Sequence, residues 1–470
     1  MSAPDLAPDV FAYPLDGIRL IEASAGTGKT WSICGLYLRL LLEGGLTVDR
    51  VLVVTFTKAA TAELSARIRA RIVDTLRVLD GGDPGPVPFV PRLIAVSAAA
   101  GIDPATMAER LRHALQVFDE AAIFTIHGFC QRALADTPFA AGLPDALELV
   151  EDDSALRREV AEDFWRRRVA GAALPAALAR LLVGSGDCPE KWADYLRADM
   201  ARPLATRLWD ETAAASSPDE AETALRRAFA ALDGTQLPAT LATLNGPAVK
   251  LHKGSYKPET VATAAAQWSA WLASGDPLHP LPAAKERKLH LLAAATLADK
   301  STGGAAPPAH PFFDAADTLL AARSALEEAT AAARLALLRD FLAECAEDLR
   351  ARKRAQRQIA FDDILWNAHR ALTGDDQPWL AAALHARYPA ALIDEFQDTD
   401  PLQFAIFSRV YDRPGARGSL FLVGDPKQAI YSFRSADLFA YLAAREQADA
   451  RYTLAHNQRS TPALIDACNR

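Results

Sequence analysis

Cysteine is scarce in this 470-residue chain, and its five copies lie far apart. They are Cys34, Cys130, Cys188, Cys345 and Cys468. The odd count and the lack of a CxxC pair argue against a disulfide framework and favour free thiols. His127 and Cys130 are three residues apart, but the other two ligands of a tetrahedral zinc site are missing. We therefore expect no zinc or iron–sulfur centre.

The chain also lacks a long hydrophobic run and a targeting segment. No apolar stretch approaches the ~20 residues that span a bilayer. The first residues, MSAPDLAPDV, show no basic region followed by an apolar one, so they do not have the pattern of a signal peptide. By default we expect a cytoplasmic protein. Its length predicts two or more domains.

An excess of positive charge is lacking as well, since the formal net charge is −8. A protein that coats DNA without sequence preference would be basic. A motor that grips nucleic acid in one channel can be acidic overall. The charge therefore weakly disfavours DNA binding without excluding it.

The apolar pattern of the first 135 residues predicts alternating strands and helices. VLVVT, residues 51–55, is a β-branched run typical of a strand buried on both faces. Shorter strands are expected at 19–22 and 123–126, and a helix at 31–42. Another helix is expected at 59–79, with one apolar face. That face is formed by Leu64, Ile68, Ile72 and Leu76.

The middle of the chain has a different character. From about residue 152 to 350, Ala, Leu and Arg dominate and β-branched runs disappear, which predicts a mainly helical insertion. The alternation then returns, with the apolar runs PAALIDE (389–395) and SLFLVGD (419–425) ending in acids. We therefore predict an α/β fold with a parallel sheet, built from residues 1–150 and 351–450, with a helical domain at 151–350 inserted.

Residues 23–30 read ASAGTGKT and match a phosphate-binding loop with alanine for the first glycine. The loop consists of Ala23, Ser24, Ala25, Gly26, Thr27, Gly28, Lys29 and Thr30. Small residues let backbone N–H groups surround an anion, and the next helix points its positive end at the phosphates. Lys29 would neutralise phosphate oxygens and Thr30 would ligate Mg²⁺. An incidental strand–turn–helix is the alternative, which the flanking strand and helix disfavour.

Asp394 and Glu395 follow the apolar run AALI and could form a second half-site. An aspartate at the end of a strand can hold Mg²⁺ through water, and a neighbouring glutamate can orient or deprotonate an attacking water. A pair of solvated loop acids is the alternative, which the phosphate loop disfavours.

Several segments, in this order along the chain, resemble the superfamily 1 helicases of the UvrD-like group. They are ASAGTGKT, TFTKAATAELSARIR (55–69), TIHGFCQRAL (125–134), DEFQDTDPLQ (394–403) and GDPKQAIYSFRSAD (424–437). The resemblance implies a RecA-like motor domain that uses ATP and Mg²⁺ and moves 3′→5′ on single-stranded DNA. Within the group the segments look most like helicase–nuclease subunits of double-strand-break repair and recombination, which act on double-stranded DNA ends with further subunits as partners.

The resemblance also implies roles for individual residues. Asp394 would serve the metal and Glu395 the hydrolytic water. Gln428 would sense the γ-phosphate, and Arg459 would act as an arginine finger. The segments that contact the DNA strand or link it to the nucleotide contain Thr57, Lys58, His127, Tyr431, Phe433 and Arg434.

The residues alone leave other interpretations of the DNA contacts open. Tyr431 and Phe433 can stack on bases or pack beneath a loop. Lys58 can neutralise a backbone phosphate or only solvate the start of a helix. His127 alone would be interpreted as a core or capping residue.

The chain departs from the group at Gln458, where relatives carry an aromatic that stacks on adenine. Trp31 lies close enough to the phosphate loop to substitute, although we favour helix packing for it. The later motifs of the group would follow residue 470. We therefore expect 451–470 to open a second motor domain, and the chain to be an N-terminal portion without the nuclease. Those later motifs would supply another phosphate-binding arginine. A portion without it would bind ATP but hydrolyse it poorly, because an arginine finger is worth ~10³–10⁵ in rate.

Two alternatives to a helicase–nuclease subunit with several partners stay open. One is the corresponding subunit of a two-subunit counterpart, and the other is a non-catalytic module that binds ATP and DNA.

Other clusters have structural interpretations that we favour. Residues 361–364, FDDI, match a family segment but predict a helix cap. A basic stretch that could touch duplex DNA, although a solvated loop is favoured, contains Lys250, Lys253, Tyr256 and Lys257. A solvated helix face is expected for Arg350, Arg352, Lys353, Arg354 and Arg357. A place in a core is expected for Trp268 and Trp271.

Overall fold

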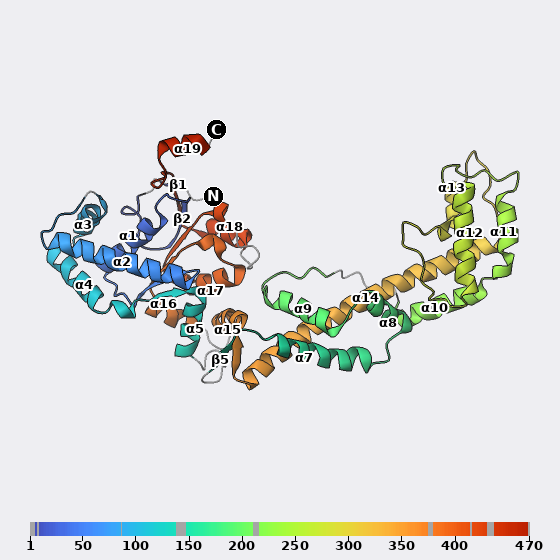
Figure 1. The fold of residues 1–470 in the computed structure, drawn as a ribbon, viewed down its shortest axis with the longest axis horizontal. Helices are drawn as coiled ribbons and strands as arrows, with labels where there is room; N and C mark the ends of the chain where they lie inside the picture. Colours follow the sequence, from blue (N-terminus) through green and yellow to red (C-terminus); the bar gives the residue numbers. More distant parts are fainter. Residues whose placement is uncertain are drawn as a thin grey trace. The chain divides into compact units, whose positions relative to one another are not determined.

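The computed structural model describes residues 5–6, 9–85, 87–137, 147–209, 216–374, 379–413, 416–429 and 437–468. The chain forms two compact units (Figure 1). Unit 1 consists of Met1–Asp153, Asp199–Thr206 and Arg350–Arg470. Unit 2 consists of Ser154–Ala198 and Arg207–Leu349. The two ends of the chain thus build one unit, and the middle builds the other.

Unit 1 contains a seven-stranded sheet in which all neighbouring strands are parallel, in the order β1-β11-β2-β10-β7-β3-β4. The strands are β1 (Asp5–Leu6), β2 (Ile18–Ala23), β3 (Val51–Thr55), β4 (Ile123–Thr125), β7 (Ala390–Ile393), β10 (Ser419–Gly424) and β11 (Ala450–Leu454). The predicted parallel α/β fold is confirmed. Because β7 and β10 lie between β2 and β3, strands from both ends of the chain build one continuous sheet.

Helices cover both faces of this sheet. One face is covered by α1 (Lys29–Leu42), α2 (Lys58–Leu79), α3 (Phe89–Ala99) and α4 (Pro104–Gln116). The other is covered by α5 (Ile126–Asp136), α15 (Phe361–Thr373), α16 (Leu380–Arg387), α17 (Pro401–Tyr411) and α18 (Leu438–Gln447). Val53 of β3 joins the first core and Val54 the second, as expected of a strand buried on both faces. The predicted apolar face of α2 is buried in the first core.

Short elements complete unit 1. β5 (Glu148–Val150) pairs in parallel with β6 (Gln358–Ala360), and β8 (Asp412–Arg413) pairs antiparallel with β9 (Ala416–Arg417). Short 3-10 turns are η1 (Phe118–Glu120), η5 (Phe396–Asp398) and η6 (Pro426–Gln428), and the last helix is α19 (Pro462–Cys468). Among the described residues, no helix has the length and apolarity needed to cross a membrane.

Unit 2 is helical, as predicted. Its helices are α7 (Ser154–Trp165), α8 (Ala176–Gly184), α9 (Pro189–Met200), α10 (Pro218–Ala231), α11 (Leu237–Leu244), α12 (Pro258–Ala273), α13 (Ala294–Lys300) and α14 (Pro311–Ala355), of which α9 and α14 end in unit 1. Short turns are η2 (Arg166–Ala170), η3 (Gly234–Gln236) and η4 (Leu289–Leu292). Trp268 and Trp271 are both 0% exposed and stack with their ring centroids 5.6 Å apart, which confirms their predicted core position.

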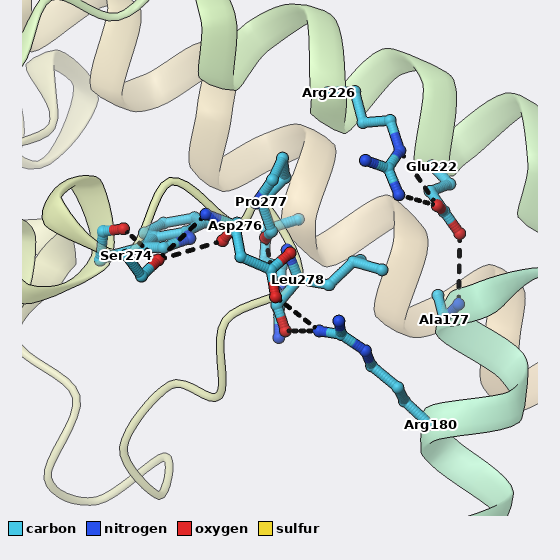
Figure 2. A network of polar contacts seen from close by, with 10 residues as sticks. Ala177, Arg180, Glu222, Arg226, Ser274, Asp276, Pro277 and Leu278 are labelled. Carbon is cyan, nitrogen blue, oxygen red and sulfur yellow. Dashed lines mark hydrogen bonds and ion pairs between the residues drawn. The ribbon is translucent and has the colours of Figure 1, made fainter.

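Polar contacts join the helices of unit 2 (Figure 2). Glu222 of α10 accepts a hydrogen bond from the backbone N–H of Ala177 in α8, at 3.2 Å. Arg180, also in α8, donates to Asp276 Oδ2 and to the carbonyl oxygen of Leu278, each at 2.8 Å. These contacts tie α8 both to α10 and to the loop that follows α12. In the predicted basic stretch of this unit, the hydroxyl of Tyr256 donates to a backbone carbonyl, while the three lysines are exposed.

The basic end of α14 differs from the prediction of a solvated face. Lys353 is 3% exposed, and its Nζ lies 3.0 Å from Asp153 Oδ2 and 2.5 Å from Asp363 Oδ2. The Arg350 guanidinium lies over the Trp366 ring, 4.7 Å from its centroid. The expectation was wrong for Lys353, because two carboxylates compensate the buried charge.

Candidate nucleotide-binding site

The carboxyl ends of three neighbouring strands bring the predicted nucleotide-binding residues together. Ala23 ends β2, Asp394 directly follows β7, and Asp425 directly follows β10. β10 lies between β2 and β7. Since carboxyl ends of parallel strands meet at one edge of a sheet, ligands of such folds bind there.

The loop between β2 and α1 depends on its glycines. Gly26 has φ +79° and Gly28 has φ +103°, in the left-handed region that favours glycine. A Cβ added at Gly26 would lie 2.8 Å from the Cβ of Arg459, so a larger residue does not fit. Gly28 directly precedes α1, whose first residue is Lys29. The strand–loop–helix context predicted for the phosphate loop is confirmed.

Lys29 connects the loop to the other predicted catalytic residues. Its Nζ donates to Glu395 Oε2 at 2.6 Å and to Gln428 Oε1 at 3.3 Å. Lys29 and Glu395 are 366 positions apart in the sequence. The fold therefore places Glu395 and Gln428, which were singled out in separate segments, within hydrogen-bond distance of Lys29.

Asp394 and Thr30 are the predicted metal ligands. Asp394 Oδ1 accepts a hydrogen bond from the Glu395 backbone N–H at 2.9 Å. Burial, together with the charge of Glu395, raises the pKa of Asp394 to about 6. Thr30 lies in the first turn of α1. A hydroxyl and a carboxylate are hard oxygen donors of the kind Mg²⁺ takes beside phosphate oxygens, so this donor set fits that ion.

Glu395 has an uncommon backbone conformation, with φ +50° and ψ +44° in the left-handed region. For a residue with a side chain this costs on the order of 1–3 kcal/mol and persists only where surrounding contacts hold it. The turn carries the chain from β7 into η5. The carboxylate it presents is held by Lys29 and by Gln397, whose Nε2 donates to Oε2 at 2.8 Å.

The sequence analysis missed Gln397 and Asp425. Gln397 is 2% exposed, and its Oε1 accepts from the Asp425 backbone N–H at 2.8 Å. Asp425 Oδ2 in turn accepts from Gln428 Nε2 at 2.7 Å. Both residues lie inside segments that resemble the family. This position in the sequence was the feature that could have identified them. No spacing rule predicts that they meet.

Asp398 is a further buried acid of this site that the sequence analysis did not single out. It is 6% exposed, and its Oδ1 has no hydrogen-bond partner in the described part of the chain. Burial and the charge of Glu395 raise the pKa of Asp398 to about 6. The charge of Glu395 thus contributes to the raised pKa of two neighbouring acids, Asp394 and Asp398.

Arg459 and Gln458 lie against the phosphate loop. The Gln458 backbone N–H donates to the Gly26 carbonyl oxygen at 2.8 Å, and the exposed Arg459 follows it. Trp31 instead packs edge-on against Phe11 and Phe89, with centroids 5.3 and 5.4 Å away. The favoured interpretation of Trp31 as a packing residue is confirmed.

The candidate DNA residues of the first half lie beyond β3 and β4, at the same edge of the sheet. Thr57 caps α2, since its hydroxyl accepts from the Ala60 N–H at 3.1 Å, and the exposed Lys58 begins that helix. His127 lies in the first turn of α5, where burial lowers its pKa despite the nearby charge of Asp362. These positions bring Thr57, Lys58 and His127 to neighbouring strand ends, because β3 pairs with β4.

The other candidate DNA residues, Tyr431, Phe433 and Arg434, fall in 430–436, outside the described residues. For the FDDI segment, Asp363 Oδ2 accepts from the Ala360 N–H at 3.0 Å, where α15 begins. The favoured interpretation as a helix cap is confirmed.

A parallel sheet, a phosphate-type loop leading into a helix and an acidic pair after a neighbouring strand define a P-loop nucleoside triphosphatase fold. Comparison with protein families narrows this class. The UvrD/REP helicase N-terminal domain matches residues 9–449. The chain belongs to the UvrD/REP helicase family.

Several curated proteins that are similar to this chain are RecB subunits of the RecBCD enzyme. That of Escherichia coli K12 is 38% identical over 98% of this chain and 38% of its own length. That of Haemophilus influenzae is 33% identical over 97% of this chain and 40% of its own length. That of Mycobacterium tuberculosis H37Rv is 30% identical over 95% of this chain and 29% of its own length. The chain thus spans two fifths or less of these relatives.

Proposed function

We propose that this chain carries the ATP-dependent motor of a RecB-type DNA helicase and translocase, which moves 3′→5′ on single-stranded DNA. The observation that carries the proposal is the meeting of Lys29, Glu395 and Gln428 within 2.6 and 3.3 Å at the carboxyl edge of the sheet. If Lys29 were an incidental loop lysine and Glu395 a solvated acid, nothing would require the two side chains to lie together. A phosphate group bound there would contact Lys29 and Gln428, and Glu395 would lie beside it.

Different residues of the site would carry out different parts of ATP hydrolysis. The amides of residues 23–28 and the Lys29 ammonium would hold the phosphates of ATP. Thr30 and Asp394 would hold Mg²⁺, which supplies charge neutralisation on the phosphate oxygens. Glu395 would orient the attacking water and accept its proton, and Gln428 would sense the γ-phosphate.

We propose that Glu395 and the phosphate oxygens of ATP compete for the Lys29 ammonium. In this structure its ammonium is bonded to Glu395 Oε2. Phosphate oxygens would draw Lys29 away, and Glu395 would then be free to act on water. Arg459, whose Cβ lies beside Gly26, is proposed as the residue that stabilises charge on the transferred phosphoryl group.

The DNA track is proposed to cross the same edge. Thr57, Lys58 and His127 lie at the neighbouring ends of β3 and β4 and would contact the backbone of single-stranded DNA. Tyr431, Phe433 and Arg434 would link the nucleotide state to base stacking. These three roles rest on the family resemblance.

The assembly is proposed from the relatives. Their names place them in the RecBCD enzyme, so we propose RecC- and RecD-type partners, double-stranded DNA ends as substrate, and a cytoplasmic role in double-strand-break repair and recombination. The same names favour this type over the AddA-type subunit of the two-subunit counterpart.

The domains are proposed to follow the motor plan of the family. Residues 1–150 and 351–450 would form motor domain 1A, 151–350 the insertion 1B, and the following residues the start of domain 2A. β11 pairs with β2 in the sheet of unit 1. We therefore propose that the junction between the motor domains lies after Leu454, the last residue of this strand, rather than at residue 450.

ATP turnover with and without oligo-dT tests the proposed function. We expect slow, Mg²⁺-dependent turnover that oligo-dT stimulates and that Glu395→Gln lowers by about 10²-fold or more, since the carboxylate is the proposed base. Glu446→Gln, an exposed glutamate of α18, is the matched control and should turn over ATP like the wild type. Equal turnover by wild type and Glu395→Gln would contradict the proposal.

A further inference from the structure

We propose that Gln397 is a positioning residue for hydrolysis: it holds the Glu395 carboxylate in place and ties it to the strand that leads to Gln428. This inference rests on the proposed function. Gln397 is 2% exposed, and both ends of its amide are bonded. Nε2 donates to Glu395 Oε2 at 2.8 Å, and Oε1 accepts from the Asp425 N–H at 2.8 Å.

The packing around Gln397 fixes its amide. A Cβ added at Gly424 would lie 2.7 Å from Gln397 Oε1 and 3.1 Å from the Gln397 backbone nitrogen. Glycine at the end of β10 therefore lets the amide lie directly against the strand. A side chain held this closely cannot exchange partners without moving β10 or η5.

The contacts close a ring of five residues. Lys29 Nζ donates to Glu395 Oε2, which also accepts from Gln397 Nε2. Gln397 Oε1 accepts from the Asp425 N–H, and Asp425 Oδ2 accepts from Gln428 Nε2. Gln428 Oε1 accepts from Lys29 Nζ, which completes the ring. The side chains proposed to bind phosphate, activate water and sense the γ-phosphate are thus joined through Gln397 and Asp425.

The ring predicts what remains when phosphate draws Lys29 away. Glu395 loses one donor on Oε2 and Gln428 loses its donor on Oε1. The bond from Gln397 to Glu395 Oε2 persists, so that Oε1 of Glu395 is directed to the water whose proton it would accept. The bond from Gln397 to Asp425 keeps β10, and with it Gln428, in register with Glu395.

The substitution Gln397→Glu separates the contact of residue 397 with Glu395 from its contact with Asp425. A carboxylate can still accept from the Asp425 N–H, but it cannot donate to Glu395 and it repels the neighbouring charge. We expect affinity for ATP to stay within about threefold, and turnover at about pH 8 to fall by about 10–100-fold, the usual effect of losing a supporting hydrogen bond. Turnover relative to wild type should recover toward about pH 6, because a protonated Glu side chain donates again.

The matched control is Gln403→Glu. Gln403 is also a buried glutamine of the same segment, but its Oε1 accepts from the Asp400 N–H and does not contact Glu395. Because glutamate suits this helix-capping position, turnover and its pH profile should match the wild type. If Gln397→Glu melts below the assay temperature, Gln397→Met, which keeps the volume and has no donor, should lower turnover without recovery at acid pH.

The outcomes separate the two proposals. A wild type whose turnover equals that of Glu395→Gln would overturn the proposed function, and this inference with it. A wild type that is active, beside a folded Gln397→Glu with turnover within twofold and the wild-type pH profile, would overturn this inference alone. Undiminished turnover in folded Gln397→Met would do the same.

Discussion

Replacing Asp398 by asparagine should stabilise unit 1 at neutral pH and leave its stability unchanged in acid. Asp398 is 6% exposed and close to the charge of Glu395. Burial and that charge disfavour its ionised form, so its pKa rises from 3.8 to about 6. Asparagine has nearly the same shape and carries no charge to bury.

The magnitude follows from the two pKa values. A difference from 3.8 to about 6 corresponds to about 3 kcal/mol, at about 1.4 kcal/mol for each pKa unit. Since the pKa of the folded state is the higher one, the wild type loses this free energy of unfolding as pH rises through the range from about 4 to 6. The gain of Asp398→Asn should therefore be absent below about pH 4, grow up to about pH 6 and stay constant above about pH 7.

Urea denaturation at several pH values measures this gain. Hydrogen exchange of the β7 and β10 amides would report on unit 1 by itself. Asp119→Asn, at an exposed aspartate of the same unit, is the control and should change little at any pH. A gain that is absent at about pH 8, or that is equal at about pH 4 and pH 8, would refute the reasoning.

Three other changes have defined outcomes. Lys353→Ala leaves the carboxylates of Asp153 and Asp363 without their cation and should lower the free energy of unfolding by about 3–5 kcal/mol in urea; a loss under about 1 kcal/mol would contradict this. Gly26→Ala forces a Cβ into a left-handed turn, at a cost of about 1–3 kcal/mol, and a nucleotide titration should show weakened binding, whereas wild-type affinity would show that the loop adapts freely. Trp268→Ala should destabilise unit 2 by about 3–5 kcal/mol in a near-UV circular dichroism melt, and an unchanged midpoint would refute its core role.

The elements of the fold could be predicted because their patterns are local. A β-branched run such as VLVVT is a strand buried on both faces wherever it lies, and the structure has β3 at Val51–Thr55. The face of α2 follows from the spacing of its apolar residues. Glycines and the GKT sequence predicted the loop between β2 and α1, because backbone geometry and helix direction act within a few residues.

The remaining features depend on contacts between distant segments. The basic run at the end of α14 gives no sign that Lys353 is buried, because one of its two partners, Asp153, lies 200 positions away. Gln397 and Asp425 are 28 positions apart and meet only because β7 and β10 are neighbours in the sheet. The order of the strands, and with it the ring around Gln397, depends on packing between distant segments. The spacing of apolar residues within one segment does not determine that order.

The most direct test of the proposed motor is a titration with a fluorescent ATP analogue, with and without oligo-dT, of the wild type and Lys29→Ala. We expect the wild type to bind, oligo-dT to change its affinity several-fold through linkage, and Lys29→Ala to weaken binding about 10-fold or more, because charged hydrogen bonds to phosphate are lost. Lys300→Ala, at a partly exposed lysine of unit 2, should bind like the wild type. Equal affinities of the wild type and Lys29→Ala, or an affinity that oligo-dT leaves unchanged, would contradict a DNA-coupled ATP site at this loop.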